Sequence, residues 1–366
     1  MMKQSKKPAK RSAGRVIGRI LLTIVLVVVL LLGGMIGCLS LTEYRPADTE
    51  TLSVDHAAAG SLRAGDSLTV LTWNIGYGAL GDNADFFMDG GSSVYTADRA
   101  RVDANLDGIL TIVRQQSPDL LLLQETDLDS SRSRHVDERA RITDALSGFD
   151  SVFANNFKVA FLPYPVPPMG KVDSGLLTLS SYPVDEAARI QLPIPFSWPM
   201  RMANLKRCLL LSRIPLEGGG ELVLVNLHLE AYDDGEGKIA QTAMLRDILD
   251  REAAAGNYVI AGGDFNQIFS NADVNAYPAQ EGKWQAGQID ASVFSDAWQL
   301  RMDASVPSCR SLDQPYAGAD AAGFQYYLID GFIFSSNIRV DALQTLDCGF
   351  VCTDHNPVRA EITLLP

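Results

Sequence analysis

The sequence predicts an α/β protein in which two β-sheets pack face to face with helices on their outer faces, preceded by one N-terminal transmembrane helix. Three observations support this prediction: many short runs rich in Val, Ile and Leu, few helical stripes, and one long uncharged apolar segment. Several short runs are nearly continuous, which is typical of strands buried on both faces. With 366 residues, 47% of them hydrophobic, the chain can build a large core, which excludes a disordered chain and a small disulfide-stapled protein.

The first predicted element is the apolar segment at residues 20–42, which contains no charge. At about 1.5 Å per residue it is long enough to cross a bilayer as one helix. Residues 1–19 carry seven basic and no acidic side chains, so the positive-inside rule predicts a cytoplasmic N-terminal tail and an extracytoplasmic remainder. We therefore expect a single-pass protein of the cell membrane, in contact with the lipid bilayer. A cleaved signal peptide and a lipid attached at Cys38 are alternatives, and both also export the remainder.

The formal net charge of −13 conceals two regions of opposite sign. Removing the seven basic residues before the apolar segment leaves 24 of the 31 basic residues against all 44 acidic residues, a net charge of −20. So acidic a body argues against strong nonspecific binding of polyanions, which depends on many Lys and Arg contacts to phosphate.

Residues 43–66 are small and polar and are expected to form a linker, and residues 67–366 are expected to form one domain without internal repeats. Apolar stripes predict helices at 99–116 and 238–254. The three glycines at 218–220 predict a hairpin turn between two strands. An exported domain also permits a disulfide between Cys309 and either Cys348 or Cys352. Strands are expected at 68–75, 120–124, 175–179, 208–214, 221–229, 258–262, 328–334 and 360–364.

Polar side chains interrupt or follow many of the expected strands. Strand alternation places Asn226 and His228 on one face of the same strand. Asp330 stands inside an otherwise apolar strand, which is costly unless its carboxylate has a partner. Taken singly, each such residue has an ordinary interpretation as a solvated strand end or a satisfied core residue. In chain order the set is Asn74, Glu125, Asn226, His228, Asp264, Asn266, Asp330, Asp354 and His355.

This set resembles the endonuclease/exonuclease/phosphatase superfamily, the DNase I-like proteins, over about residues 67–366. The resemblance implies a four-layer α/β/β/α sandwich. It also implies hydrolysis of phosphate esters or phosphodiesters with a divalent cation, usually magnesium, with manganese as an alternative. The motifs that carry it are, in order, Trp73-Asn74, Gln124-Glu125, 175–183, 226–229, 263–266, Ile329-Asp330 and Asp354-His355.

By the same resemblance, Glu125 is the principal metal ligand, with Asn74 close by and Asp354 contributing directly or through water. Asn226 is assigned to substrate binding.

The resemblance also implies a catalytic group. Asp330 hydrogen-bonds His355 and fixes its tautomer. Asp264 is a second candidate for orienting or deprotonating the attacking water, and the sequence leaves open which of His355 and Asp264 is the base. Asn266 donates a hydrogen bond to the phosphate, and His228 is a second phosphate contact that assists the leaving group.

The superfamily includes DNases, abasic-site nucleases, sphingomyelinase-like enzymes and inositol-phosphate phosphatases, so the fold does not name the substrate. Export and a membrane anchor favour extracellular nucleic acid or a lipid head group. The acidic and aromatic loop at 78–93 is open between a substrate rim and a solvated surface loop. Groove candidates such as Phe157, Tyr164, Trp198 and Arg207 are open between groove, core and rim. We infer no protein partner. The alternative function is a catalytically idle, membrane-tethered binding module, which loss of an essential site residue would favour.

Overall fold

The computed structural model of the protein describes residues 13–233 and 235–366. The chain divides into two units, Met1–Glu43 and Tyr44–Pro366. In its described part, the first unit is the helix α1 (Ala13–Leu41), and residues 14–41 are long and apolar enough to cross a membrane or to serve as a signal sequence. Most of the basic tail predicted at 1–19 lies outside the described residues.

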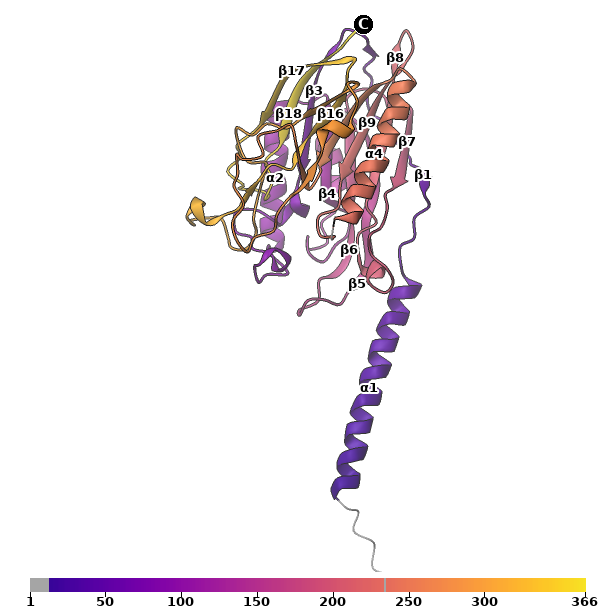
Figure 1. Ribbon diagram of the computed structural model, residues 1–366. Helices are drawn as coiled ribbons and strands as arrows, with labels where there is room; N and C mark the ends of the chain where they lie inside the picture. The colour runs from indigo at the N-terminus through magenta and orange to yellow at the C-terminus, as the bar shows by residue number, and fades with distance from the viewer. Residues whose placement is uncertain (1–12, 234) are drawn as a thin grey trace, which may run out of the picture. The chain divides into compact units, whose positions relative to one another are not determined.

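The second unit contains two large β-sheets (Figure 1). One sheet has the strand order β1-β7-β8-β9-β10-β16-β13, with β2 paired to β8, and the other has the order β17-β18-β3-β4-β6-β5. The strands of the first sheet are β1 (Thr49–Thr51), β2 (Leu62–Arg63), β7 (Glu186–Gln191), β8 (Cys208–Glu217), β9 (Glu221–His228), β10 (Tyr258–Asp264), β13 (Trp298–Arg301) and β16 (Asp330–Ser335). Those of the second are β3 (Ser67–Asn74), β4 (Leu120–Asp127), β5 (Asp150–Leu162), β6 (Gly170–Ser180), β17 (Ile338–Thr345) and β18 (Val358–Leu364).

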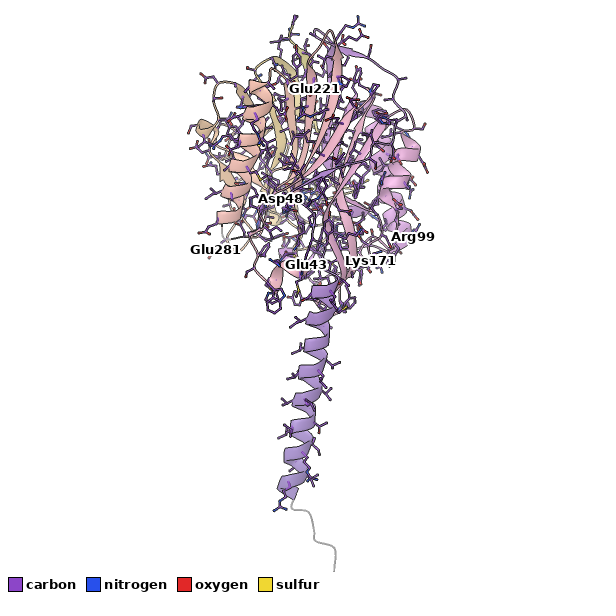
Figure 2. All side chains as sticks on the ribbon, turned by 90° about the vertical axis from the view of Figure 1, so that its right-hand side faces the viewer. Glu43, Asp48, Arg99, Lys171, Glu221 and Glu281 are labelled. Atoms are coloured by element: carbon purple, nitrogen blue, oxygen red, sulfur yellow. The ribbon has the colours of Figure 1, made fainter. Side chains whose placement is uncertain are left out.

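The main core lies between these sheets, and helices cover their outer faces. In β9, Leu222 and Leu224 belong to the core shared with the other sheet, whereas Val223 and Val225 pack with Leu245 of α4 (Glu236–Ala254). The opposite outer face carries α2 (Arg99–Gln116) and α3 (Glu138–Ala145), as Figure 2 shows at the end of α2 marked by Arg99. The predicted four-layer α/β/β/α sandwich is therefore confirmed.

The helical stripes at 99–116 and 238–254 correspond to α2 and α4, and the three glycines join the antiparallel strands β8 and β9 with positive φ at each. The helix α3 and the sheet strands β5, β7, β13 and β17 were not predicted. Nor were the short paired strands β11 (Gln267–Phe269), β12 (Gly287–Ile289), β14 (Cys309–Arg310) and β15 (Tyr326–Tyr327). Strands β5 and β17 are the two edges of their sheet, and their alternating polar and exposed residues hide the apolar signal of a central strand. All five cysteines are free in the structure.

The segment expected to be a linker contributes two short strands to the first sheet. β1 pairs with β7, and β2 pairs with β8. Leu62 is buried in the core between the sheets. Strands of two and three residues are too short to show a hydrophobic period, so the sequence gives no sign of them.

Strand direction brings the predicted site residues to one end of the sandwich. β9 and β10 are parallel, and their last residues, His228 and Asp264, are register partners. β16 runs antiparallel to β10, so its first residue, Asp330, pairs with Asp264. β3 and β4 are also parallel and end at Asn74 and just beyond Glu125.

Candidate active site

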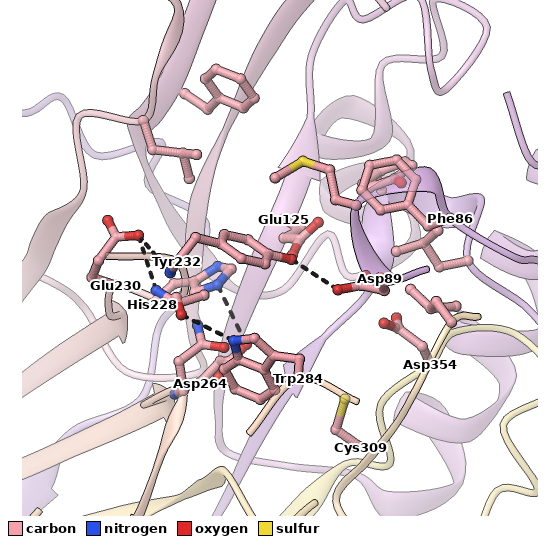
Figure 3. A pocket seen from close by; sticks show the side chains of 18 of the residues that line it. Phe86, Asp89, Glu125, His228, Glu230, Tyr232, Asp264, Trp284, Cys309 and Asp354 are labelled. Carbon is pink, nitrogen blue, oxygen red and sulfur yellow. Dashed lines mark hydrogen bonds and ion pairs between the residues drawn. The ribbon is translucent and has the colours of Figure 1, made fainter. Parts of the chain in front are cut away.

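A cavity of about 320 Å³ opens at this end of the sheets. Its lining includes six of the nine residues predicted to form the site, and Figure 3 shows several of them from close by. Asn74 and Asp330 support the lining residues from behind, whereas Asn226 does not reach the cavity. The six are Glu125, His228, Asp264, Asn266, Asp354 and His355.

Asp330, His355 and Asp264 form a buried chain of polar groups. Nδ1 of His355 lies 2.9 Å from Oδ2 of Asp330, and its Nε2 lies 3.8 Å from Oδ2 of Asp264. Each of the three residues is at most 5% exposed. Asp330 thus has the partner that its place in an apolar strand requires, and the ring of His355 is held with its second nitrogen toward Asp264.

Burial and neighbouring charges raise the pKa values of Asp264 and His355 and lower that of His228. Burial, followed by repulsion from Asp330, raises the pKa of Asp264 to about 7. Burial alone would lower the pKa of His355, but the carboxylate of Asp330, together with Cys309 and Asp354, outweighs it and holds this pKa well above the usual value. His228, with Nε2 at 3.4 Å from Oδ2 of Asp264, has its pKa lowered well below the usual value by burial and then by Arg207. At neutral pH the site therefore combines a cationic and a neutral histidine.

Asn74 links the two sheets at the floor of the cavity. Its Nδ2 donates to Oε1 of Glu125 and to Oδ2 of Asp264, both at 3.1 Å, while its Oδ1 accepts the backbone N–H of Gly76 at 3.0 Å. Both carboxylates are thereby fixed by one amide. The amide oxygen is engaged with the backbone, so the structure shows Asn74 as the residue that orients Glu125.

The backbone at Glu125 departs from the regular strand. The β4–β6 register shifts between Leu123 and Thr126, and Glu125 adopts a left-handed conformation with φ of 54°. Such a conformation is rare for a residue with a side chain and is frequent at functional sites. Desolvation raises the pKa of Glu125, and the charge of Asp354 adds to that effect. Two carboxylates that repel each other at a cavity floor suit a divalent cation bound by oxygen ligands.

Asn226 and Asn266 are placed differently from each other. Nδ2 of Asn226 donates to the carbonyls of Leu123 and Leu177, and its Oδ1 accepts from Gln124 at 2.8 Å, so its amide is used between the sheets. Asn226, predicted to bind substrate, does not line the cavity, and of the two residues on this strand face only His228 does. Asn266 lines the cavity and donates to the carbonyl of Leu229 at 2.9 Å.

Three buried arginines line the cavity, and the sequence motifs did not identify them as a group. Arg132 pairs with Asp127 at 2.9 Å. Arg207 pairs with Glu230 at 3.3 Å and donates to the carbonyl of His228. Arg310 donates to two backbone carbonyls. Their positive charge suits an anionic substrate, but they are far apart in sequence and only the fold brings them to one cavity.

The loop at 78–93, which the sequence left open between rim and surface, contributes Phe86, Met88 and Asp89 to the cavity wall. The hydroxyl of Tyr232 donates to Oδ1 of Asp89 at 3.3 Å and joins this loop to the segment after β9 (Figure 3). Desolvation, followed by the charge of Asp354, raises the pKa of Asp89 to about 7. The rim of the cavity is therefore held together by a polar contact between two loops.

Solved structures with the same fold come from several organisms. An endonuclease/exonuclease/phosphatase from Beutenbergia cavernae DSM 12333 is 20% identical, with a TM-score of 0.57 over 82% of this chain and 72% of the other. One from Bacteroides vulgatus is 14% identical, with a TM-score of 0.54 over 82% and 99%. TDP2 from D. rerio, complexed with single strand DNA product, is 15% identical, with a TM-score of 0.51 over 81% and 99%. At these identities the likeness shows the fold.

A comparison with curated proteins found no match. The sequence profile of the Endonuclease/Exonuclease/phosphatase family matches residues 71–347, which include β9, β10 and β16 with His228, Asp264 and Asp330. The match ends before Asp354 and His355, which lie in the loop that precedes β18. The chain therefore belongs to the endonuclease/exonuclease/phosphatase family.

Proposed function

We propose that this protein is a magnesium-dependent phosphodiesterase whose catalytic domain is exported and held at the membrane by α1. The observation that carries the proposal is the register of three strands, which sets His228, Asp264 and Asp330 side by side next to His355. Membership of the family, whose fold is that of phosphoesterases, supports it.

The divalent cation would be held by Glu125 and Asp354, with Asn74 orienting Glu125. The two carboxylates fit such an ion because they are oxygen donors whose mutual repulsion an added positive charge relieves. Manganese, with similar ligand preferences, is the alternative ion. When bound, the cation supplies positive charge that polarises a phosphoryl oxygen.

Asp264 is the group best suited to take a proton from the attacking water. Its pKa of about 7 is matched to a general base at neutral pH, and Asn74 fixes the carboxylate that faces the cavity. His355 has the opposite electrostatic character, since Asp330 favours its cationic form. In that form it donates hydrogen bonds to the developing negative charge on phosphate.

His228 and Asn266 would complete the phosphate contacts. The low pKa of His228 keeps its imidazole neutral, so it acts as a hydrogen-bond donor without adding charge. Both residues lie on the cavity wall beside Asp264. Arg207, behind His228, adds positive potential at the same wall.

The membrane placement follows from α1 and the basic residues before it. We propose that α1 is an uncleaved anchor with a cytoplasmic N-terminus, because seven basic residues precede the apolar segment and the body carries net negative charge. The catalytic domain then lies outside the cytoplasmic membrane.

The test uses the full-length chain in detergent, assayed on bis(p-nitrophenyl) phosphate with magnesium or with EDTA. We expect magnesium-dependent hydrolysis that falls by about 10²–10⁴-fold in His355→Ala, the usual contribution of a proton-transfer or charge-stabilising group. DNA, sphingomyelin and an inositol phosphate extend the panel. Wild type no faster than His355→Ala on every substrate would contradict the proposal and favour the idle binding module.

A further inference from the structure

Two loops beside the cavity expose large apolar side chains. The first is the end of β5 with the β5–β6 connection, and the second is the β7–β8 connection. We call their exposed apolar residues the apolar collar. Isolated exposed apolar residues are common, but a contiguous group usually marks an interaction surface. The collar consists of Phe161, Tyr164, Val166, Ile194, Trp198 and Met200, exposed by 49%, 68%, 92%, 37%, 55% and 64%.

Both connections border the mouth of the cavity. Leu162 and Met169 from the first and Phe196 and Leu205 from the second line the same cavity. The second connection also contacts β5, where the backbone N–H of Lys206 donates to the carbonyl of Asn156 at 2.7 Å. The collar therefore lies on loops that border the cavity.

The collar differs in charge from the rest of the domain. Residues 160–170 carry no charge, and residues 192–207 carry no acidic side chain and three basic ones, of which Lys206 and Arg207 are buried. The part of the chain after residue 42 has a net charge of −20, as 24 basic and 44 acidic residues give. This entrance is thus the part of an acidic domain that can approach an anionic or zwitterionic surface without repulsion.

Few residues separate α1 from the first strand of the domain. The N–H of Gln191, the last residue of β7, donates to the carbonyl of Asp48 at 2.9 Å, so the chain enters the sheet at the point where the β7–β8 connection leaves it. α1 ends at Leu41. Seven residues at about 3.5 Å each reach about 25 Å at most. If α1 spans a bilayer, the start of the β7–β8 connection is held within this distance of its surface.

We propose that the apolar collar docks on the surface of the bilayer that holds α1, and that the substrate is a phospholipid whose head-group phosphodiester enters the cavity from that surface. The identity of the substrate rests on the proposed phosphodiesterase function. Trp and Tyr favour the membrane interface because one end of the ring is apolar and the other is polar. Leu162, Met169 and Phe196 offer the lipid's glycerol and upper acyl segments an apolar wall just inside the entrance.

Docking is tested with the full-length chain reconstituted in vesicles of phosphatidylcholine and phosphatidylglycerol with brominated acyl chains, which quench tryptophan fluorescence at short range. Trp198 is the exposed tryptophan of the collar, whereas Trp298 is 7% exposed and packs near α4. We expect Trp198→Phe to remove about half or more of the quenching, as a residue at the membrane interface would. The control Trp298→Phe should retain the quenching. Equal quenching in the two variants would overturn the docking.

The substrate is tested with Trp198→Ser/Met200→Ser, which changes two collar residues that do not line the cavity. We expect unchanged turnover of bis(p-nitrophenyl) phosphate and about tenfold or greater loss on vesicle phospholipid, from lost interfacial burial. If the wild-type protein hydrolyses the soluble diester but no phospholipid, the lipid substrate alone is overturned. If the wild-type protein hydrolyses neither, the proposed function is refuted, and the quenching experiment still decides docking. If single-stranded DNA changes the fluorescence of Trp198 and vesicles do not, the collar binds nucleic acid and the proposal is overturned.

Discussion

Nδ1 of His355 lies 2.9 Å from Oδ2 of Asp330, and this contact organises the site. The second carboxylate oxygen of Asp330, Oδ1, is buried and has no hydrogen-bond partner in the described part of the chain. His355 is therefore the side chain that compensates the charge of Asp330. The same contact turns Nε2 of His355 toward Asp264 and the cavity.

We expect Asp330→Asn to lower kcat by about 10²–10⁴-fold with little change in KM, because the orientation and charge of His355 act mainly on the transition state. The substitution also removes the carboxylate that raises the pKa of His355, so this pKa should fall. Steady-state kinetics and NMR titration of the histidine measure the two effects. The exposed Asp296→Asn should change neither. A kcat within threefold of wild type, about 0.7 kcal/mol, would show that Asp330 only fills space.

Glu125→Gln should have opposite effects with and without metal. Desolvation raises the pKa of Glu125, so its charged form costs stability at neutral pH, and the amide should raise the melting temperature in EDTA. Magnesium stabilises a protein that binds it by about 2.7 kcal/mol at 100 times Kd, and the variant should lose this gain.

Differential scanning calorimetry with magnesium or EDTA measures both effects of Glu125→Gln. The exposed Glu281→Gln is the matched control and should keep the magnesium shift of wild type. A full magnesium shift in Glu125→Gln would remove Glu125 from the metal site.

The central strands and the site motifs could be predicted from the sequence because each depends on a local signal. The four leucines before Gln124 identify a doubly buried strand, and Gly262-Gly263 identify a close backbone approach before Asp264. Strand direction alone then brings the ends of these strands together. The sequence did not show that Asn226 lies between the sheets, because alternation gives the face of a strand but not how far along it the two sheets remain in contact.

The arginines of the cavity show what local patterns leave out. Arg132 lies in a charged stretch that resembles a solvated loop, yet its guanidinium stacks 3.7 Å from the ring centroid of Tyr77 and pairs with buried Asp127. No spacing in the sequence links it to Arg310. Such a cluster depends on tertiary packing. The same is true of the edge strands β5 and β17, whose sequences show no regular pattern of buried apolar residues.

The activity should depend on pH through Asp264. Burial and then Asp330 raise its pKa to about 7, so below that pH the carboxyl is protonated and cannot accept a proton from water. With saturating magnesium, kcat/KM should fall about tenfold per pH unit below about pH 7 and level off above it. Asp264→Asn should be nearly inactive, and its residual kcat/KM should not show this fall below about pH 7. A wild-type profile that is flat from about pH 5.5 to about pH 8 would exclude Asp264 as the base.

Gly263 fixes the position of Asp264, and its replacement should be among the most damaging substitutions in the chain. It has φ of 150°, and a Cβ there would lie 1.9 Å from the carbonyl oxygen of Leu227, its register partner on β9. Gly263→Ala must therefore separate β9 from β10 where His228 and Asp264 meet. We expect a loss of about 4 kcal/mol or more in the free energy of unfolding, measured by urea denaturation in detergent, and loss of activity.

The control for Gly263→Ala is Gly148→Ala, where no atom lies within 4 Å of the added Cβ and φ is not positive. Its stability should stay within about 0.5 kcal/mol of wild type or rise, because alanine restricts the unfolded chain more than glycine does. Equal stability of the two variants would mean that β9 and β10 tolerate a wider spacing at Gly263. The register of His228 with Asp264 would then not need glycine, and the close approach of the two strands would not be what sets the geometry of the site.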